Sequence, residues 1–361
     1  MRSTAGSDYP WQKRAEGGTR MSSPQPRRTL HIAVELDGAH TEAARTDPRI
    51  LAEAVTGAER AGFTFATFDD APVPPGGGFR IDATVRAAYA ATRTVRIGLA
   101  PVSHVLTAEP FHLAAQLASL DHATHGRAAW LVGAADTAEA LATVGRPRPE
   151  DHRREVADVV ETIRRLWDSW EDDAVIADVA TGRYLDPDKV HHVDFTGETF
   201  SVKGPLITPR PPQGSLVVLA AEDLAEVVRP DIVLVGGTDA EDLRLRARQA
   251  AGSGAPLVFG ELEVLLVPGA PADRPANGRA RYTGSAAGLA ELLGELSADL
   301  DGVRLHPAVP AADLPLLGRE VLPELHRLGL HAPPEPGVTL RSTLGLARPE
   351  NRFAAASKGI A

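Results

Sequence analysis

Side chains able to do acid–base chemistry stand at the ends of two apolar runs of the chain. Asp69 and Asp70 follow one run directly, and Ser103 and His104 close the next. A carboxylate can accept hydrogen bonds or take up a proton, a hydroxyl can donate or accept, and an imidazole exchanges a proton near neutral pH. The alternatives are local capping of a turn by the aspartates and a packed, fully bonded ring for His104. Both interpretations stay open from the residues alone.

Regular structure must position these residues, and short apolar or β-branched runs alternate with longer amphipathic stretches beyond residue 29. We predict eight strands, at 30–36, 63–68, 95–100, 127–132, 216–220, 231–235, 257–266 and 302–305. We predict helices at 50–61, 83–92, 110–123, 152–170, 240–250, 286–296 and 314–328. The alternation indicates a parallel sheet with crossover helices, and eight strands favour a (β/α)8 TIM barrel over an open doubly wound sheet.

In such a barrel the functional residues gather where the strands end, at the carboxyl face. Asp69, Asp70, Ser103 and His104 occupy such positions, and so does the segment from Trp130 to Ala134. We therefore expect these side chains to meet around one mouth.

Two segments break the regular alternation. Residues 170–214 are too many for a simple helix-to-strand loop, and their Gly and Pro content predicts an ordered excursion across the barrel between the fourth helix and the fifth strand. Residues 221–229 are too few for a full crossover between two parallel strands. Something has been shortened at the fifth βα unit.

Composition sets the limits of function. The chain has 361 residues, 43% of them hydrophobic, and no cysteine, which excludes disulfides and thiolate metal sites and fits a cytoplasmic protein. The histidines lack acidic partners at metal-site spacing, so no metal is expected. A net charge of −10 argues against nucleic acid as a partner, and no apolar run is long enough to cross a membrane. Residues 1–28 are predicted to be a disordered tail, 29–335 the barrel and 336–361 a C-terminal extension.

Long motifs resemble one known family. They include GFTFATFDDA at 62–71, the segment 80–130, LWDSWEDDA at 166–174, GPLITPRPPQG at 204–214 and TLRSTLGLARPENRF at 339–353. Together they resemble the bacterial-luciferase-like, flavin-dependent monooxygenases, and within them the branch with nitrilotriacetate, dibenzothiophene-sulfone and alkanesulfonate-type oxygenases. The resemblance runs from about residue 31 to residue 353.

The resemblance implies a (β/α)8 barrel that uses reduced FMN and O₂ to oxidise a small organic substrate. A separate flavin reductase would supply the reduced FMN, and family members commonly form homodimers. Asp70 and His104 would be the catalytic residues. The residues implied to bind the cofactor are Asp69, Asp70, Ser103, Trp130, Gly133, Arg153 and Arg154.

Three departures from the family pattern bear on the flavin. Leu131 stands where the family has Asn after Trp, and Arg154 stands where an Arg-Tyr pair has its Tyr. Where the family carries a Gln-Ala-Gly-x-Ser-x-x-Gly phosphate turn, this chain has Glu222 and Asp223, which would repel a phosphate. Arg153 and Arg154 could form a relocated phosphate clamp. The alternatives are a degenerate homologue with weak or no flavin binding, acting as a binding or structural protein, and a deazaflavin-dependent enzyme.

Overall fold

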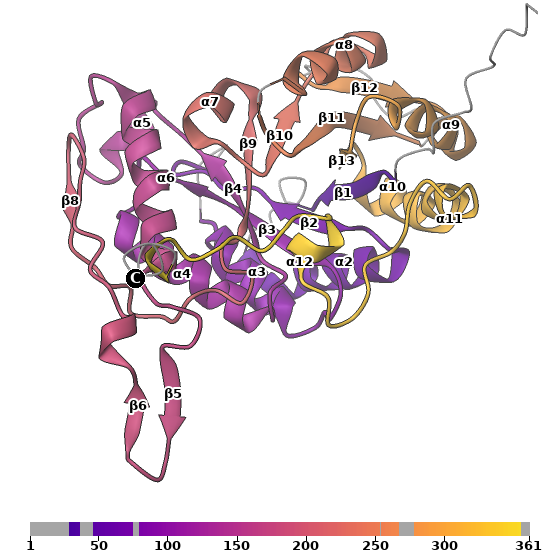
Figure 1. Cartoon of the computed structure of the whole chain (residues 1–361). Helices are drawn as coiled ribbons and strands as arrows, with labels where there is room; N and C mark the ends of the chain where they lie inside the picture. Colours follow the sequence, from indigo (N-terminus) through magenta and orange to yellow (C-terminus); the bar gives the residue numbers. More distant parts are fainter. Residues whose placement is uncertain (1–28, 37–45, 75–78, 253, 267–277, 355–361) are drawn as a thin grey trace, which may run out of the picture.

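A computed structural model describes residues 29–36, 46–74, 79–252, 254–266 and 278–354, and it contains a closed parallel barrel (Figure 1). Its eight strands are β1 (His31–Glu35), β2 (Phe65–Phe68), β3 (Gly98–His104), β4 (Ala129–Gly133), β9 (Val217–Ala221), β10 (Ile232–Val235), β11 (Leu257–Leu265) and β13 (Gly302–Pro307). Each pairs in parallel with the next, and β13 pairs with β1 to close the ring. Every predicted strand is present, so the predicted (β/α)8 fold is confirmed.

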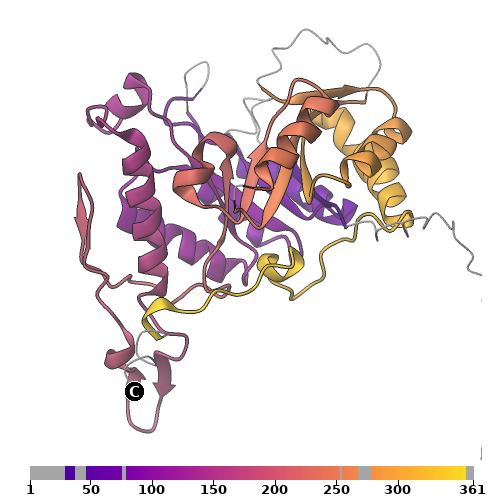
Figure 2. The same cartoon turned by 45° about the horizontal axis from the view of Figure 1, so that its top comes forward.

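Helices cover the outside of the barrel, as Figure 2 also shows. They are α2 (Pro48–Ala61), α3 (Ala83–Ala91), α4 (Pro110–Ala123), α6 (His152–Asp168), α8 (Ala240–Ala250), α9 (Ala286–Leu296) and the continuous α10 (Pro310–Leu316), η4 (Leu317–Val321) and α11 (Leu322–Arg327). The limits of α2 follow from its sequence. The Asp47 carboxylate accepts from the backbone N–H of Arg49, Pro48 pre-sets the first turn, and Gly62 ends the helix with a φ of 98°.

The floor of the barrel is closed by the C-terminal segment. Leu340, on the short helix α12 (Leu340–Thr343), and Leu344 join the apolar cluster inside the barrel, which includes Phe65 and Phe259. Leu340 lies against Gly98 at the start of β3, where a side chain would collide with it. Because this amino-terminal end is filled, only the carboxyl ends of the strands can hold a ligand inside the barrel.

Part of the predicted C-terminal extension is thus integral to the barrel. The Arg341 guanidinium binds both carboxylate oxygens of Asp231, at 3.0 and 2.9 Å, at the start of β10. The predicted tail, residues 1–28, lies outside the described residues.

An additional strand, β12 (Ala280–Thr283), enters the wall at the mouth. The first half of β11 pairs with β10, and its second half pairs with β12. The backbone N–H of Gly237, just after β10, donates to the carbonyl of Gly278, just before β12. The mouth is therefore wider by one strand than the floor. Sequence reasoning missed β12 because its ARYT sequence carries no apolar run.

The predicted excursion between α6 and β9 is present, but it does not cross the barrel. Its strands β7 (Phe195–Thr196) and β8 (Ser201–Val202) lie along α6, where the Glu198 backbone N–H donates to Asp158. The hairpin of β5 (Val175–Asp178) and β6 (Arg183–Leu185) projects away from the barrel (Figure 1). The expectation of a path across the barrel was wrong, because the segment packs along α6 and also binds Asp121 of α4 and Arg341 of the C-terminal segment.

The shortening after β9 is confirmed. The crossover from β9 to β10 consists of the 3₁₀ turn η3 (Glu222–Leu224) and the four-residue helix α7 (Ala225–Val228).

Candidate active site

Three of the predicted residues lie together at the carboxyl ends of β2 and β3. Asp70, Ser103 and His104 line one cavity of about 420 Å³, to which Arg80 and Thr107 also contribute. Parallel strands end at the same edge of the sheet, so the residues at and just after the ends of β2 and β3 lie near one another.

Asp70 is held by backbone groups. Its two carboxylate oxygens accept from the N–H of Ala71 at 2.9 Å and of Ala83, the first residue of α3, at 2.6 Å. The Arg80 Nε atom lies 3.9 Å from the carboxylate. Burial raises the pKa of Asp70 above its ordinary value, and the two backbone bonds oppose this rise. Asp70 therefore fixes the loop and the start of α3 at the wall of the cavity.

His104 has a backbone partner on each ring nitrogen. The Ala135 N–H donates to Nδ1 at 3.1 Å, so Nε2 carries the proton that is donated to the Asp70 carbonyl at 3.0 Å. The neutral Nε2–H tautomer satisfies both bonds. Gly133 makes the ring's position possible, because a Cβ atom there would lie 2.6 Å from Nδ1 of His104.

Trp130 and Ser103 point to the outer side of the barrel wall. Trp130 is fully buried and meets Trp167 of α6 edge to face, with ring centroids 6.2 Å apart. The Ser103 hydroxyl lies 3.4 Å from that of Thr84 on α3. Asp69 contributes its backbone carbonyl to Arg86 at 2.5 Å. Of these, Ser103 still reaches the cavity, whereas the position of Trp130 between sheet and helix favours a packing role.

The two predicted clamp arginines bind groups of the protein itself. Arg153 donates to the Asp223 carbonyl at 2.6 Å and to the Glu226 carboxylate at 3.3 Å. Arg154 pairs with Asp158 at 3.3 Å, one turn along α6. Arg153 thus reaches the turn after β9, whereas Arg154 is directed along its own helix.

The turn after β9 is a poor fit to a phosphate as it stands. Glu222 accepts from Arg246 of α8 at 2.6 Å, and both side chains are more than a third exposed. The side chains available here are two carboxylates and two engaged guanidiniums, without a glycine-rich cradle. The cavity at the ends of β2 and β3 thus offers hydrogen-bonding side chains, whereas the turn after β9 offers carboxylates.

A buried charged cluster that the sequence analysis did not identify occupies the mouth inside β11 and β13. The Glu261 carboxylate accepts from Arg304 Nε at 2.8 Å, from Arg304 Nη2 at 2.9 Å and from His306 Nε2 at 2.5 Å. Arg304 also reaches the Thr67 hydroxyl of β2 at 3.3 Å. Phe259, two residues before Glu261, faces the barrel interior. This two-residue periodicity was the signal that could have found the cluster.

Two more arginines join the cluster, one on the added strand β12 and one just before it. Arg279 lies 3.4 Å from Glu261, and Arg281 lies 3.2 Å from Glu263. Burial opposes ionisation of Glu261, but Arg304 and His306 outweigh it and hold the pKa of this carboxyl well below its usual range. Burial lowers the pKa of His306 to about 4, against the pull of Glu261. At neutral pH Glu261 is therefore ionised and the His306 imidazole is neutral.

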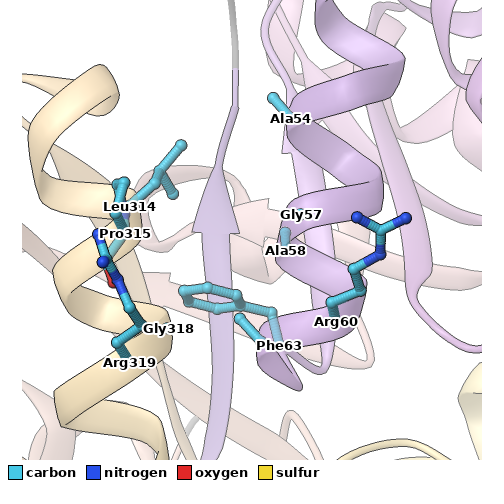
Figure 3. A pocket seen from close by; sticks show the side chains of 10 residues that line it. Ala54, Gly57, Ala58, Arg60, Phe63, Leu314, Pro315, Gly318 and Arg319 are labelled. Carbon is cyan, nitrogen blue, oxygen red and sulfur yellow. The ribbon is translucent and has the colours of Figure 1, made fainter.

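A second cleft, of about 380 Å³, lies outside the barrel between α2 and η4 (Figure 3). Phe63 lies between the two helices, and Arg60 and Arg319 stand on opposite sides. Gly57 leaves open space in the wall of this cleft, whereas a Cβ atom at Gly318 would lie 2.9 Å from Cβ of Ala61. Among the residues that the structure describes, no carboxylate or imidazole lines this cleft. The mouth of the barrel is therefore the better candidate for chemistry.

Two further properties hold for the described part of the chain. It contains no group of three or more His, Asp or Glu side chains arranged to hold a metal ion. None of its helices combines the length and the apolar character needed to span a membrane.

Comparisons with known proteins agree with this geometry. The family model for luciferase-like monooxygenases matches residues 29–263. A component of the pristinamycin IIA synthase of Streptomyces pristinaespiralis is 33% identical over 311 residues, covering 84% of this chain and 91% of that protein. N-acetyl-S-(2-succino)cysteine monooxygenase of Bacillus subtilis (strain 168) is 43% identical over 131 residues, 36% of this chain and only 30% of that protein. Nitrilotriacetate monooxygenase component A of Aminobacter aminovorans is 34% identical over 209 residues, 57% of this chain and 46% of that protein.

Solved structures share the fold. A long-chain alkane monooxygenase superposes with a TM-score of 0.79 at 19% identity, covering 91% of this chain and 99% of that one. Riboflavin lyase, solved with modified FMN and riboflavin, gives a TM-score of 0.78 at 22% identity over 92% of this chain and 99% of that one. The family model spans well over half of the chain, and one relative is matched along nearly its whole length. The chain therefore belongs to the luciferase-like monooxygenase family.

Proposed function

We propose that this protein is an FMN-dependent monooxygenase that uses reduced FMN and O₂ to oxidise a small organic substrate. The observation that carries the proposal is the cavity of about 420 Å³, because it brings Asp70, Ser103 and His104 together at the carboxyl ends of two strands of a family barrel. The lack of a dinucleotide-binding fingerprint in the sequence supports a separate reductase as the source of reduced FMN. A cytoplasmic location and a homodimer belong to the same proposal.

Bound reduced FMN would supply the activation of O₂. The chain's own residues do the positioning. Asp70 holds the loop and the start of α3, and His104 is held as a neutral ring by the carbonyl of Asp70 and the N–H of Ala135. The cavity between them is where a flavin ring and a substrate can be shielded from water.

A specific observation keeps the degenerate homologue as a second candidate. Glu222 and Asp223 stand in the turn after β9, and Arg153 and Arg246 are engaged with this turn. A barrel that has lost flavin could keep its fold with such a turn.

The two candidates are separated by titrating the purified protein with oxidised and photoreduced FMN. Product formation is then measured with a general flavin reductase, NADH and O₂. The relatives give a first substrate panel: N-acetyl-S-(2-succino)cysteine, nitrilotriacetate and dibenzothiophene sulfone. Flavin binding with oxidation of any of these compounds supports the enzyme. Absence of flavin binding in both redox states supports the degenerate homologue.

The same titration with coenzyme F420 tests the deazaflavin alternative. A coenzyme F420-dependent tetrahydromethanopterin reductase from Methanopyrus kandleri shares the fold, with a TM-score of 0.60 at 16% identity.

A further inference from the structure

Two histidines take inward positions near the carboxyl ends of barrel strands, and they differ in their hydrogen bonds. His104 on β3 uses both ring nitrogens for backbone groups, as described above. His306 on β13 uses only Nε2, which donates to Glu261 at 2.5 Å. No described residue provides a hydrogen-bond partner for Nδ1 of His306. Only His306 therefore keeps a lone pair for a bound reactant without breaking an existing bond.

The surroundings of His306 fix its orientation and its tautomer. Both oxygens of Glu261 are held by the Arg304 guanidinium, so the carboxylate cannot rotate away from the imidazole. Because an ionised carboxylate only accepts, Nε2 of His306 must carry the proton and Nδ1 must be the bare acceptor. This carboxylate–imidazole arrangement orients a general base in many enzymes.

The charges around His306 support a neutral resting state. Glu261 and Glu263 face it from β11, Arg304 from its own strand and Arg279 from the position before β12. Asp69 and Glu35 act on Arg304. Burial and the two arginines hold the pKa of His306 down to about 4, which Glu261 opposes. The imidazole is therefore unprotonated at neutral pH, with Glu261 available to stabilise it once a proton arrives.

We propose that His306, oriented by Glu261, is the proton-accepting residue at the mouth of this barrel. It takes a proton onto Nδ1 from an O–H or N–H group of the bound reactant. The X–H bond breaks and leaves its electron pair on X, the Nδ1–H bond forms, and the imidazolium is compensated by the Glu261 carboxylate. The proton then leaves to water. The proposal rests on the proposed function in taking the mouth as the place of reaction.

The alternative is a structural role, in which His306 only donates a hydrogen bond to Glu261. The variant His306→Gln separates the two roles, because its side-chain amide can still donate to Glu261 from near the Nε2 position but has no base at Nδ1. We expect kcat to fall roughly 100-fold or more, the range typical of a lost general base. The affinity for FMN and the KM should change by less than about threefold. A His306→Gln variant that keeps kcat within about threefold of wild type overturns the proposal.

A second measurement needs no flavin and no substrate. Nitrogen-15 NMR of histidine-labelled protein, assigned with the His306→Gln and His104→Gln variants, reports the protonation of each ring nitrogen. At pH 7 we expect His306 to have a proton on Nε2 and none on Nδ1. On acidification the proton should arrive at Nδ1 while the protein stays folded, and Glu261→Gln should move this step to lower pH by removing the compensating charge.

The NMR result distinguishes failure of this proposal from failure of the proposed function. A proton on Nδ1 at pH 7, or no protonation of Nδ1 before the protein unfolds, overturns the role of His306 whatever the flavin assays give. If Nδ1 is unprotonated at pH 7 and takes up a proton on acidification, but the protein binds no flavin, His306 remains a proton acceptor and the proposed monooxygenase function fails.

Discussion

Replacing Glu222 with Ser and Asp223 with Gly tests how the turn after β9 affects FMN. A phosphate docked at this turn would meet two carboxylates, and each like-charge contact at about 4 Å costs on the order of 1 to 4 kcal/mol, depending on the local dielectric. The change also removes the Glu222–Arg246 ion pair, whose partners are 35% and 39% exposed, so its loss costs at most about 1 kcal/mol. Once Glu222 is replaced, the guanidinium of Arg246 is available to bind the phosphate.

The net expectation is a gain in FMN affinity of about 1 to 3 kcal/mol, or roughly 5- to 150-fold. Riboflavin, which lacks the phosphate, is the matched control ligand and should gain less than about twofold. The assay is quenching of flavin fluorescence at two salt concentrations, and the gain should narrow at high salt because ions screen the long-range repulsion. An equal gain for riboflavin, or no gain for FMN, would refute the placement of the phosphate at this turn.

Three further predictions concern residues that hold the site and the floor. Gly133→Ala should displace the His104 ring, because the new Cβ atom would lie 2.6 Å from Nδ1 of His104. We expect a lower Tm and weaker binding of both FMN and riboflavin. Unchanged affinities for both ligands would contradict a role of the His104 ring position in flavin binding. Arg153→Ala should weaken FMN by about 1 to 3 kcal/mol if the guanidinium, now on the Asp223 carbonyl, turns to the phosphate; an equal loss for riboflavin would assign it to the fold. Burial raises the pKa of Asp121 to about 6 from 3.8. Because the raised pKa favours proton binding by the folded state, it adds about 3 kcal/mol to the free energy of unfolding. This contribution is fully present below about pH 4 and is lost as the pH rises through 6. Urea unfolding should show that the free energy of unfolding of the wild type declines over this pH range, and that of Asp121→Asn declines less. If the free energies of unfolding of the two proteins change in parallel with pH, the effect of Asp121 is disproved.

The fold could be predicted because its strands contain runs of apolar residues. Residues 232–235 are all apolar and all buried, as a parallel strand covered on both faces requires, so their pattern needs no tertiary information. The strand β12 could not be found in this way, because Arg281 on it and Arg279 just before it are compensated by Glu263 and Glu261 of a neighbouring strand. These arginines can occupy the barrel wall because the register of β11 with β12 places them beside the two glutamates.

The candidate site was predicted in part for a similar reason. Asp70, Ser103 and His104 stand at strand ends, where position alone suggests a role, and they do line one cavity. Trp130 has the same kind of position, but its side chain points outward to Trp167, and strand ends alone do not tell which face a residue takes. Glu261 and His306 are more than 40 residues apart, so their contact exists only once the barrel closes.

The central claim, that this barrel is a working flavin enzyme, is tested most directly by the affinity of the purified protein for FMN in its two redox states. The account predicts that photoreduced FMN binds more tightly than oxidised FMN, because the cavity serves a flavin delivered in reduced form by a separate reductase. It also predicts that the protein with FMN and NADH alone shows no steady NADH oxidation. If FMN binds in neither redox state, or if the protein with FMN oxidises NADH steadily without a reductase, the account is contradicted.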